Sequence, residues 1–428
     1  MAASLISAHP FGEAYAAKAG TASGGRWAEL QRAARAEIAR GLPGPQHEEW
    51  RFTPLTALAR VGFIPAAAAD DVDVTTVPSD VPRIEGATRV VLVNGVYRAD
   101  LSDTATDIEI ASFAPNDATG QIALAELPLV ALNTAYVTGG VTIAAKRPTT
   151  RTVHLISIGA SGSQPLAFHP RIVVTAAAGA SLTVVETHIG LPGQPFFANT
   201  VIEVDVAEDA TVRRYVAVIE DGDAFHIATS GVAVAARGTY ESFHLGLGGH
   251  RASGTVRQEI HARLNGEAAR VQLGGVYALG GESHHDFTTV ITHHAPGASS
   301  QQLFKGVLDG KSHGVYQGRV QVLQTAQKTD ARQLHKALFL TAGPEVDVKP
   351  ELEIAADDVQ CAHGATTGSI DPDHLFFLAA RGIDEPTARG LLVEGFVADA
   401  LSQVSDETAR DALQQQVTAW LRKRGGAL

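Results

Sequence analysis

The sequence of 428 residues is nearly free of sulfur, with one cysteine, Cys361, and one methionine. A single thiol cannot form a disulfide within the chain, so the sequence makes no use of an oxidising compartment. The first twenty residues lack a basic segment followed by an apolar run. No apolar stretch approaches the roughly 18 residues that span a bilayer. We therefore expect a cytoplasmic protein without a signal peptide and without a membrane partner.

An excess of positive charge is also missing. Lys and Arg total 34 against 46 Asp and Glu, which gives a formal net charge of −12. Proteins that bind nucleic acids usually carry a basic surface, so we expect no nucleic-acid partner. Aromatic residues make up only 6% of the chain, whereas there are 42 glycines. This composition indicates many tight turns and a core of small side chains.

Two familiar metal-binding motifs are absent as well. The sequence has no His-Glu-x-x-His and no paired-cysteine zinc spacing. Residues 306–312, GVLDGKS, resemble a phosphate-binding loop but have three residues between the glycines where that motif needs four. Because this segment also lies among strand-like runs, we interpret it as a turn and expect no ATP hydrolysis by that route.

Residues 1–80 predict an N-terminal helical region followed by a linker. Segment 24–45 has apolar side chains at helical intervals before a glycine and a proline end the pattern. Segment 64–82, IPAAAADDVDVTTVPSDVP, is rich in Ala, Asp and Pro, which is typical of a connection. Residues 81–140 predict a mixed lead-in, with a hairpin turning at Asn94-Gly95 and a short helix before Gly139.

From residue 141 to about 345, strand-like runs follow one another with almost no helical periodicity. Turn residues recur at intervals of 30, 29, 28 and 31 positions: Gly179, Asp209, Gly238, Gly266 and Gly297. A period of this size is typical of stacked repeats, and each period holds about two strands and two turns. The pattern predicts one coil of a flattened parallel β-helix per period. A β-sandwich is the alternative, but it does not require an even period.

Residues 346–428 predict a C-terminal helical region. Asp371 is placed as an N-cap with Pro372 at the first helical position, and Gly382 ends that helix. Two longer amphipathic segments follow from Asp384 and Ser405. Such helices at the end of a solenoid can cap it and can dock a partner.

Histidines are frequent in the second half of the strand region: His244, His250, His261, His284, His285, His293, His294 and His313. Adjacent residues on a strand point to opposite faces, so a His-His pair cannot serve one mononuclear metal site without a bulge. We interpret these histidines as solvated or hydrogen-bonded groups on an outer sheet face.

Cys361 and His363 form the strongest candidate site. Residues two apart on an extended segment share a face, so the thiol and the imidazole would project together. Both groups are suitable ligands for iron or zinc. One cysteine and one histidine cannot complete the four ligands of an iron–sulfur cluster, so a cluster held here would need ligands from another chain.

Residues 350–383, PELEIAADDVQCAHGATTGSIDPDHLFFLAARGI, resemble the signature region of the SufB/SufD family of iron–sulfur cluster assembly proteins. Segments 47–55 (HEEWRFTPL), 131–143 (ALNTAYVTGGVTI) and 171–190 extend the resemblance over most of the chain. The Cys-Ala-His-Gly-Ala-Thr run is similar to the Cys-Ser-His-Gly-Ala-Thr of the SufD branch. It differs from the Glu-His-Glu-Ala-Thr of the SufB branch. Ala362 departs from the commonest form but leaves thiol and imidazole in place.

The resemblance implies a mainly β protein, with a right-handed parallel β-helix between helical N-terminal and C-terminal parts. It implies a non-catalytic scaffold that pairs with a SufB-like subunit through the β-helix and binds a SufC-like ATPase through the C-terminal helices. Cys361 and His363 would then face transient iron or a nascent iron–sulfur cluster at the partner interface, with no tightly bound cofactor. Two alternatives remain open: a SufD-like homodimer acting without SufB, and a β-helix carbohydrate-active enzyme.

Overall fold

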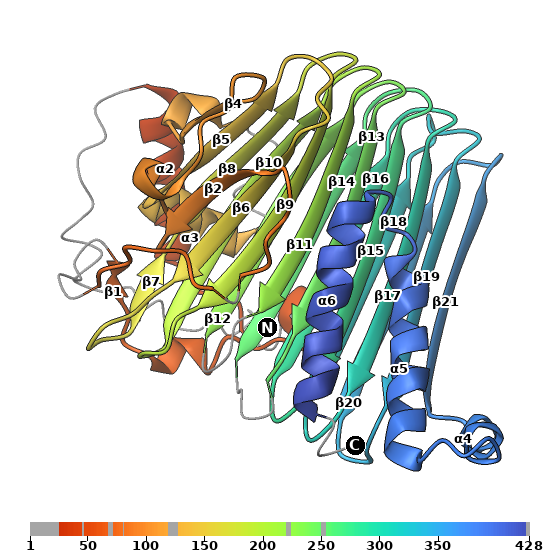
Figure 1. Cartoon of the computed structure of the whole chain (residues 1–428). Coiled ribbons are helices and arrows are strands. Elements are labelled where there is room, and N and C mark those ends of the chain that lie inside the picture. The colour runs from red at the N-terminus through yellow and green to blue at the C-terminus, as the bar shows by residue number, and fades with distance from the viewer. Residues whose placement is uncertain are drawn as a thin grey trace.

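The computed structural model describes residues 25–44, 47–66, 72–79, 81–118, 127–219, 224–249 and 254–424. Within these residues most of the chain forms two long sheets that face each other across one continuous interior (Figure 1). Strands alternate between the two sheets along the chain, and neighbouring strands within each sheet run parallel except at the N-terminal edges. The parallel β-helix predicted from the repeat is confirmed.

The first sheet, called here the eleven-stranded sheet, contains β1 (Ile64–Pro65), β4 (Glu109–Ser112), β5 (Gly139–Ala145), β7 (Leu166–Phe168), β8 (Pro170–Ala176), β10 (Phe196–Val206), β12 (Phe225–Val234), β14 (Thr255–Leu264), β16 (His284–His293), β18 (His313–Val322) and β20 (Glu345–Ile354). The ten-stranded sheet contains β2 (Thr88–Val93), β3 (Val96–Tyr97), β6 (Thr152–Gly159), β9 (Ser181–Gly190), β11 (Thr211–Ile219), β13 (Thr239–Leu247), β15 (Arg270–Leu279), β17 (Ser299–Leu308), β19 (Asp330–Phe339) and β21 (Gln360–Ser369). Each coil places one strand in each sheet. Alternate residues of every strand point into the interior, as the two-residue period of a strand requires.

One corner of the solenoid repeats the same backbone geometry from coil to coil. Its residues have a positive φ: Gly179, Asp209, Arg237, Ala268, Gly297 and Lys328. The backbone N–H of each donates to a carbonyl in the corner of the next coil, as from Gly179 to Glu208 and from Arg237 to Glu267. Two of the predicted turn residues, Gly238 and Gly266, therefore lie next to the left-handed residues Arg237 and Ala268 and are not left-handed themselves. The corner is held by hydrogen bonds between coils, so it does not need glycine each time.

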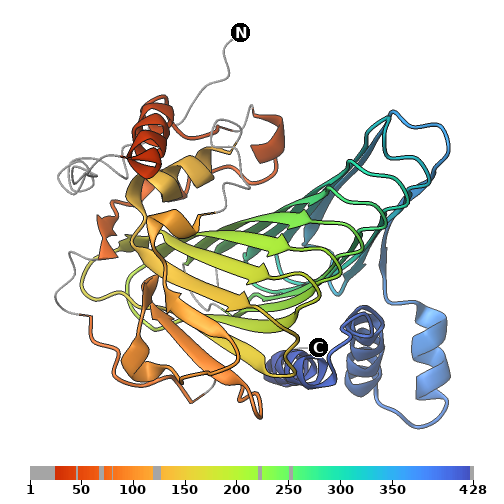
Figure 2. The same ribbon diagram turned by 90° about the horizontal axis from the view of Figure 1, so that it is seen from above.

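The N-terminal part covers the outer face of the eleven-stranded sheet (Figure 2). Helix α2 (Arg26–Ile38) packs on α3 (Pro128–Tyr136), and both were predicted. Their apolar side chains join Phe197 and Ile227 of the sheet in one cluster. The described residues of this part also form short 3-10 helices: η2 (Glu48–Trp50), η3 (Leu58–Arg60), η5 (Ala99–Leu101) and η6 (Pro115–Asp117). The predicted Asn94-Gly95 hairpin joins β2 and β3. Of the predicted linker, residues 67–71 and 80 lie outside the described residues.

The C-terminal helices lie on the opposite side, against the ten-stranded sheet (Figure 2). They are α4 (Pro372–Ala379), α5 (Glu385–Leu401) and α6 (Glu407–Arg424). Helices α5 and α6 bury Val397 and Leu413 on that sheet, whereas α4 contributes no buried residue. None of the helices in the described part of the chain is long and apolar enough to cross a membrane.

The solenoid extends further than the boundary expected at residue 345. Strands β20 and β21 add a last coil that runs to Ser369, so the Cys-Ala-His motif belongs to the β-helix and not to the helical region. The side chains of β21 are mostly exposed. Because β21 buries so few side chains, its sequence does not alternate between apolar and polar residues. A strand could therefore not be predicted for this segment.

Candidate functional site

Cys361 and His363 lie on β21, the last strand of the ten-stranded sheet. In the register with β19, Cys361 is beside Ala331 and His363 is beside Gln333. Ala331 belongs to the interior core, and the half-buried Cys361 packs against the same core. The thiol and the imidazole therefore share the inner face of the last coil, as their spacing predicted.

This end of the solenoid is open. Among the described strands, β20 and β21 each pair with one neighbour only, so both leave a row of backbone N–H and C=O groups unpaired along ten residues. Apolar side chains are exposed beside these edges, with Ile354 at 44% and Leu323 at 40% of full exposure. Unpaired, partly apolar edges are templates for another strand. The candidate ligands thus lie where a second chain can reach them.

The Cys361 thiol is not activated by its surroundings. Burial raises its pKa above the ordinary value, and the Asp330 carboxylate acts in the same direction. A backbone hydrogen bond from Ala331 opposes both effects. The raised pKa keeps the thiol protonated at neutral pH.

The prediction that the clustered histidines lie on an outer sheet face is wrong for three of them. His244, His285 and His293 are almost completely buried on the inner face. Burial lowers the pKa of His244 to about 3 and that of His293 to about 4. The reason is strand parity: His284 and His285 point to opposite sides, and the sequence does not say which side is the core.

Three of the remaining histidines of that group do lie on the outer face. His261, His284 and His313 share the outer face of the eleven-stranded sheet, on three successive coils. His261 contacts Glu259, whereas His313 contacts Asp347. His250 lies outside the described residues.

A stack of aromatic rings runs through the interior toward the last coil. We call His285, Tyr277, His335 and Tyr316 the interior ring stack. The rings of Tyr277 and His335 lie 5.9 Å apart at 20°, and those of His335 and Tyr316 lie 5.1 Å apart at 12°. His335 lies on β19, beside Ala365 of β21. Burial lowers its pKa to about 3, so this imidazole is neutral. The sequence did not single out Tyr277, His335 and Tyr316. What distinguishes them is that they point to the inner face of their strands, and the sequence alone does not show which face is the inner one.

The interior also holds a buried ion pair farther from the open end. Arg214 donates from Nη2 to Glu186 Oε2 at 2.7 Å, and both residues are almost completely buried. Burial alone would raise the pKa of Glu186, but the guanidinium outweighs it and holds that pKa well below its usual value. A buried charge is tolerated when it is paired in this way.

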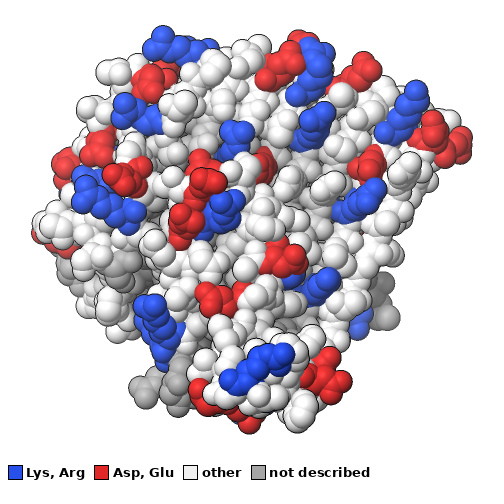
Figure 3. Space-filling view, turned by 45° about the vertical axis from the view of Figure 1, so that its right-hand side comes forward, with Lys and Arg blue, Asp and Glu red and all other residues white. Residues whose placement is uncertain are grey.

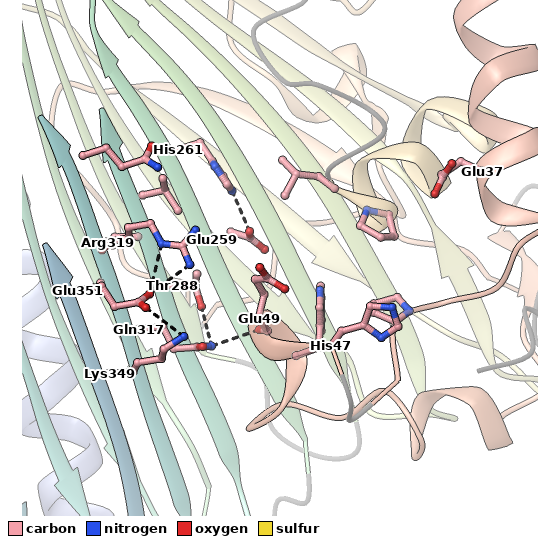
Figure 4. Close-up of a pocket in the computed structure, with 18 of the residues that line it drawn as sticks. Glu37, His47, Glu49, Glu259, His261, Thr288, Gln317, Arg319, Lys349 and Glu351 are labelled. Carbon is pink, nitrogen blue, oxygen red and sulfur yellow. Dashed lines mark hydrogen bonds and ion pairs between the residues drawn. The ribbon is translucent and has the colours of Figure 1, made fainter. Parts of the chain in front are cut away.

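A cavity of about 550 Å³ lies between the N-terminal part and the outer face of the eleven-stranded sheet. Figure 4 shows that its charged side chains contact each other across strands. Arg319 binds Glu351, and Lys349 binds both Glu351 and Glu48. Because these cations are already neutralised, the cavity does not present a site of one charge sign. On the face in Figure 3 basic and acidic residues are likewise interspersed.

Of the segment predicted as a turn, residues 309–312 form the corner after β17, with Gly310 at φ 68°. Gly306 lies within β17 on the inner face. A Cβ atom there would come 2.3 Å from the Tyr277 ring. Gly306 therefore leaves space for the Tyr277 ring of the interior ring stack and is not part of a phosphate-binding loop.

Comparison with known proteins gives the family. A family model described as the SufBD core domain of the SUF system for FeS cluster assembly matches residues 158–396. The chain belongs to the SufB/SufD family. The match spans the solenoid from β6 into α5 and includes Cys361 and His363.

Individual relatives match as well, and two of them match over much longer stretches. The iron–sulfur cluster assembly protein SufD of Escherichia coli is 30% identical over 90% of this chain and 90% of its own length. An iron–sulfur cluster assembly SufBD family protein of Synechocystis is 28% identical over 88% of this chain and 87% of its own. The chloroplastic protein ABCI7 of Arabidopsis thaliana is 31% identical over 59% of this chain.

Proposed function

We propose that this chain is a scaffold subunit for iron–sulfur cluster assembly, without catalytic activity of its own. It presents Cys361 and His363 as half of an assembly site, and a SufB-like partner supplies the other ligands. Iron or a nascent cluster is the cargo of this site. The observation that carries the proposal is that both side chains share the inner face of a strand whose outer edge is unpaired.

The two side chains fit a shared site better than a complete one. A thiolate and an imidazole are ligands for iron, but a cluster needs four. The raised pKa of Cys361 also fits a ligand that is used only when metal arrives. The named relatives from Escherichia coli and Synechocystis are both cluster assembly proteins, which favours this function over a carbohydrate-active enzyme.

Two surfaces that the described chain leaves uncovered support the partners proposed here. The edges of β20 and β21 suit a SufB-like subunit that pairs strand to strand, and without it two copies of this chain can meet there as a homodimer. Helix α4 exposes Phe376 at 75% and Phe377 at 55%. Exposed aromatic pairs of this kind mark docking sites. We assign this surface to a SufC-like ATPase.

The test is His363→Ala in cells that depend on this pathway alone. Complex formation with the two partners should persist, because His363 is exposed and contributes little to folding. Cluster yield should be lost. Gln360→Ala, an exposed change on the same strand, is the matched control and should leave the yield unchanged. Full cluster production by the His363 variant would contradict the assigned role.

A further inference from the structure

A second cluster of metal-ligating side chains lies on the outer face of the eleven-stranded sheet. His313 of β18 pairs in register with Glu345 of β20, and Asp347 lies two residues further along the same face. His313 Nε2 is 2.8 Å from Asp347 Oδ2. One ligand atom from each of the three residues lies within 4.8 Å of the other two. We call these residues the outer triad.

We propose that the outer triad binds a divalent first-row transition ion in an exchangeable way. Metal–ligand bonds of about 2.0–2.2 Å allow donor atoms to lie up to roughly 4.4 Å apart, so small side-chain shifts bring all three onto one ion. One imidazole with two carboxylates suits Fe²⁺, Mn²⁺, Co²⁺ or Zn²⁺. Three protein ligands leave coordination positions open to water, which permits exchange.

The charges around the outer triad favour a cation. In the described part of the chain, no Lys or Arg forms an ion pair with Glu345 or Asp347. The nearby Lys349 is already bound to Glu48 and Glu351. Two carboxylates held next to each other repel, and a divalent ion removes that repulsion.

The neighbour of His313 on the adjacent strand, His284, is held in place by a hydrogen bond. His284 is the register neighbour of His313 on β16, and their rings lie 4.7 Å apart, edge to face. The Thr53 hydroxyl donates to Asp286, so it accepts from His284 Nε2 at 3.0 Å. This bond fixes the His284 ring against His313. A ligand whose neighbours are fixed loses less entropy on binding a metal.

The outer triad is separate from Cys361 and His363. Glu345 begins β20 just after the turn that follows Phe339, whereas Cys361 pairs with Ala331 at the other end of β19. The triad also faces outward, and the Cys361 thiol faces the interior. The two sites therefore cannot share one ion, and either can fail without the other.

The experiment titrates the metal-free full chain with Mn²⁺ and follows the loss of the free-ion EPR signal. Co²⁺ absorption provides a second reading. We expect one ion per chain, with affinity at least tenfold weaker in Asp347→Asn and in His313→Ala. His374→Ala, an exposed histidine on α4, is the matched control and should bind as the wild type does. The Cys361→Ser/His363→Ala variant should also retain the ion, whatever its effect on cluster assembly.

Unchanged Mn²⁺ affinity in both triad variants would overturn the proposal. Glu345→Gln separates metal binding from folding, because Glu345 is exposed and has no ion pair among the described residues. It should weaken binding while leaving the metal-free melting temperature unchanged. If instead all three variants retain the ion and only His313→Ala lowers that melting temperature, the His313–Asp347 contact is structural and the outer triad is not the metal site.

Discussion

The Tyr277 hydroxyl lies 2.9 Å from His335 Nε2, although β15 and β19 are separated by the intervening strand β17. The Tyr277 ring crosses the inner face of β17 at Gly306, where any side chain would occupy the space of the ring. A neutral His335 accepts or donates in this bond according to its tautomer. The contact ties together three successive coils just before the open end.

Gly306→Ala should therefore destabilise the protein. The new methyl group would displace the Tyr277 ring, and overpacking of this kind costs about 1–3 kcal/mol, to which the lost hydrogen bond adds about 1 kcal/mol. Urea unfolding followed by circular dichroism measures the change. Gly368→Ala is the control, since a Cβ atom there meets nothing within 4 Å. Equal stability of the two variants would show that the ring does not need this gap.

Acidification should destabilise the fold below pH 6.5 through the buried histidines. Burial lowers the folded-state pKa of His335 to about 3, whereas an unfolded histidine titrates near 6.5. The unfolded state therefore binds a proton first. The stability contributed by neutral His335 is complete above pH 6.5 and is lost as the pH falls toward 3.

From pH 7 to pH 5 this loss amounts to about 2 kcal/mol for one such histidine. His335→Gln keeps a hydrogen-bonding group but cannot titrate, so its loss over the same range should be smaller by about that amount. Urea midpoints at the two pH values provide the comparison. The exposed His374→Gln should show the wild-type dependence, and the same dependence in His335→Gln would contradict the assignment.

Helix α6 should loosen when Glu241 is removed. Glu241 lies on β13 and accepts hydrogen bonds from the Tyr215 hydroxyl at 2.6 Å and from the backbone and hydroxyl of Ser405 at 2.8 and 2.6 Å. Ser405 precedes α6, so this carboxylate ties the start of the helix to the sheet. Glu241→Ala leaves three donors without their acceptor, at a cost of about 1–3 kcal/mol.

Hydrogen exchange should report this change as faster exchange in α6, with the strands of the solenoid unaffected. Glu267→Ala, in a corner loop, serves as the control for removing one carboxylate. A uniform acceleration throughout the chain would mean that Glu241 supports the whole fold and not the helix attachment.

Phe376→Ser should abolish recovery of a SufC-like ATPase with this chain. The ring is 75% exposed, so its loss should change the melting temperature by little, whereas an interface anchor typically contributes 2 kcal/mol or more to binding. Pull-down with the purified ATPase measures the effect. Asp373→Ser, on the same helix, is the polar control. Normal recovery of the ATPase by the Phe376 variant would place the docking surface elsewhere.

Much of the solenoid could be predicted because its corners recur at a nearly constant interval. The left-handed corner residues Gly179, Asp209 and Gly297 were all identified from the sequence. Arg237 and Ala268 were not, because their neighbours Gly238 and Gly266 gave the stronger turn signal. The predicted corners therefore differ from the observed ones by one and two residues. Hydrogen bonds between coils, and not the residue type, determine which residue becomes left-handed.

The site could be predicted only in part. The shared face of Cys361 and His363 follows from a spacing of two on a strand, but their place on an open edge depends on which coil is last. The strand character of β21 could not be seen, because its exposed side chains carry no apolar alternation. The inward direction of His285 was equally hidden, since the two members of a His-His pair look alike until the core is known.

The free edges of β20 and β21 also limit how large an assembly can grow. If a second solenoid meets this end with its own last coil, its edge strands run in the opposite direction and pair antiparallel with β20 and β21. Such a pairing is related by a two-fold axis and consumes both open edges at once. An association of this kind stops at two solenoids, whether the second is a related subunit or another copy, and does not continue into a fibre.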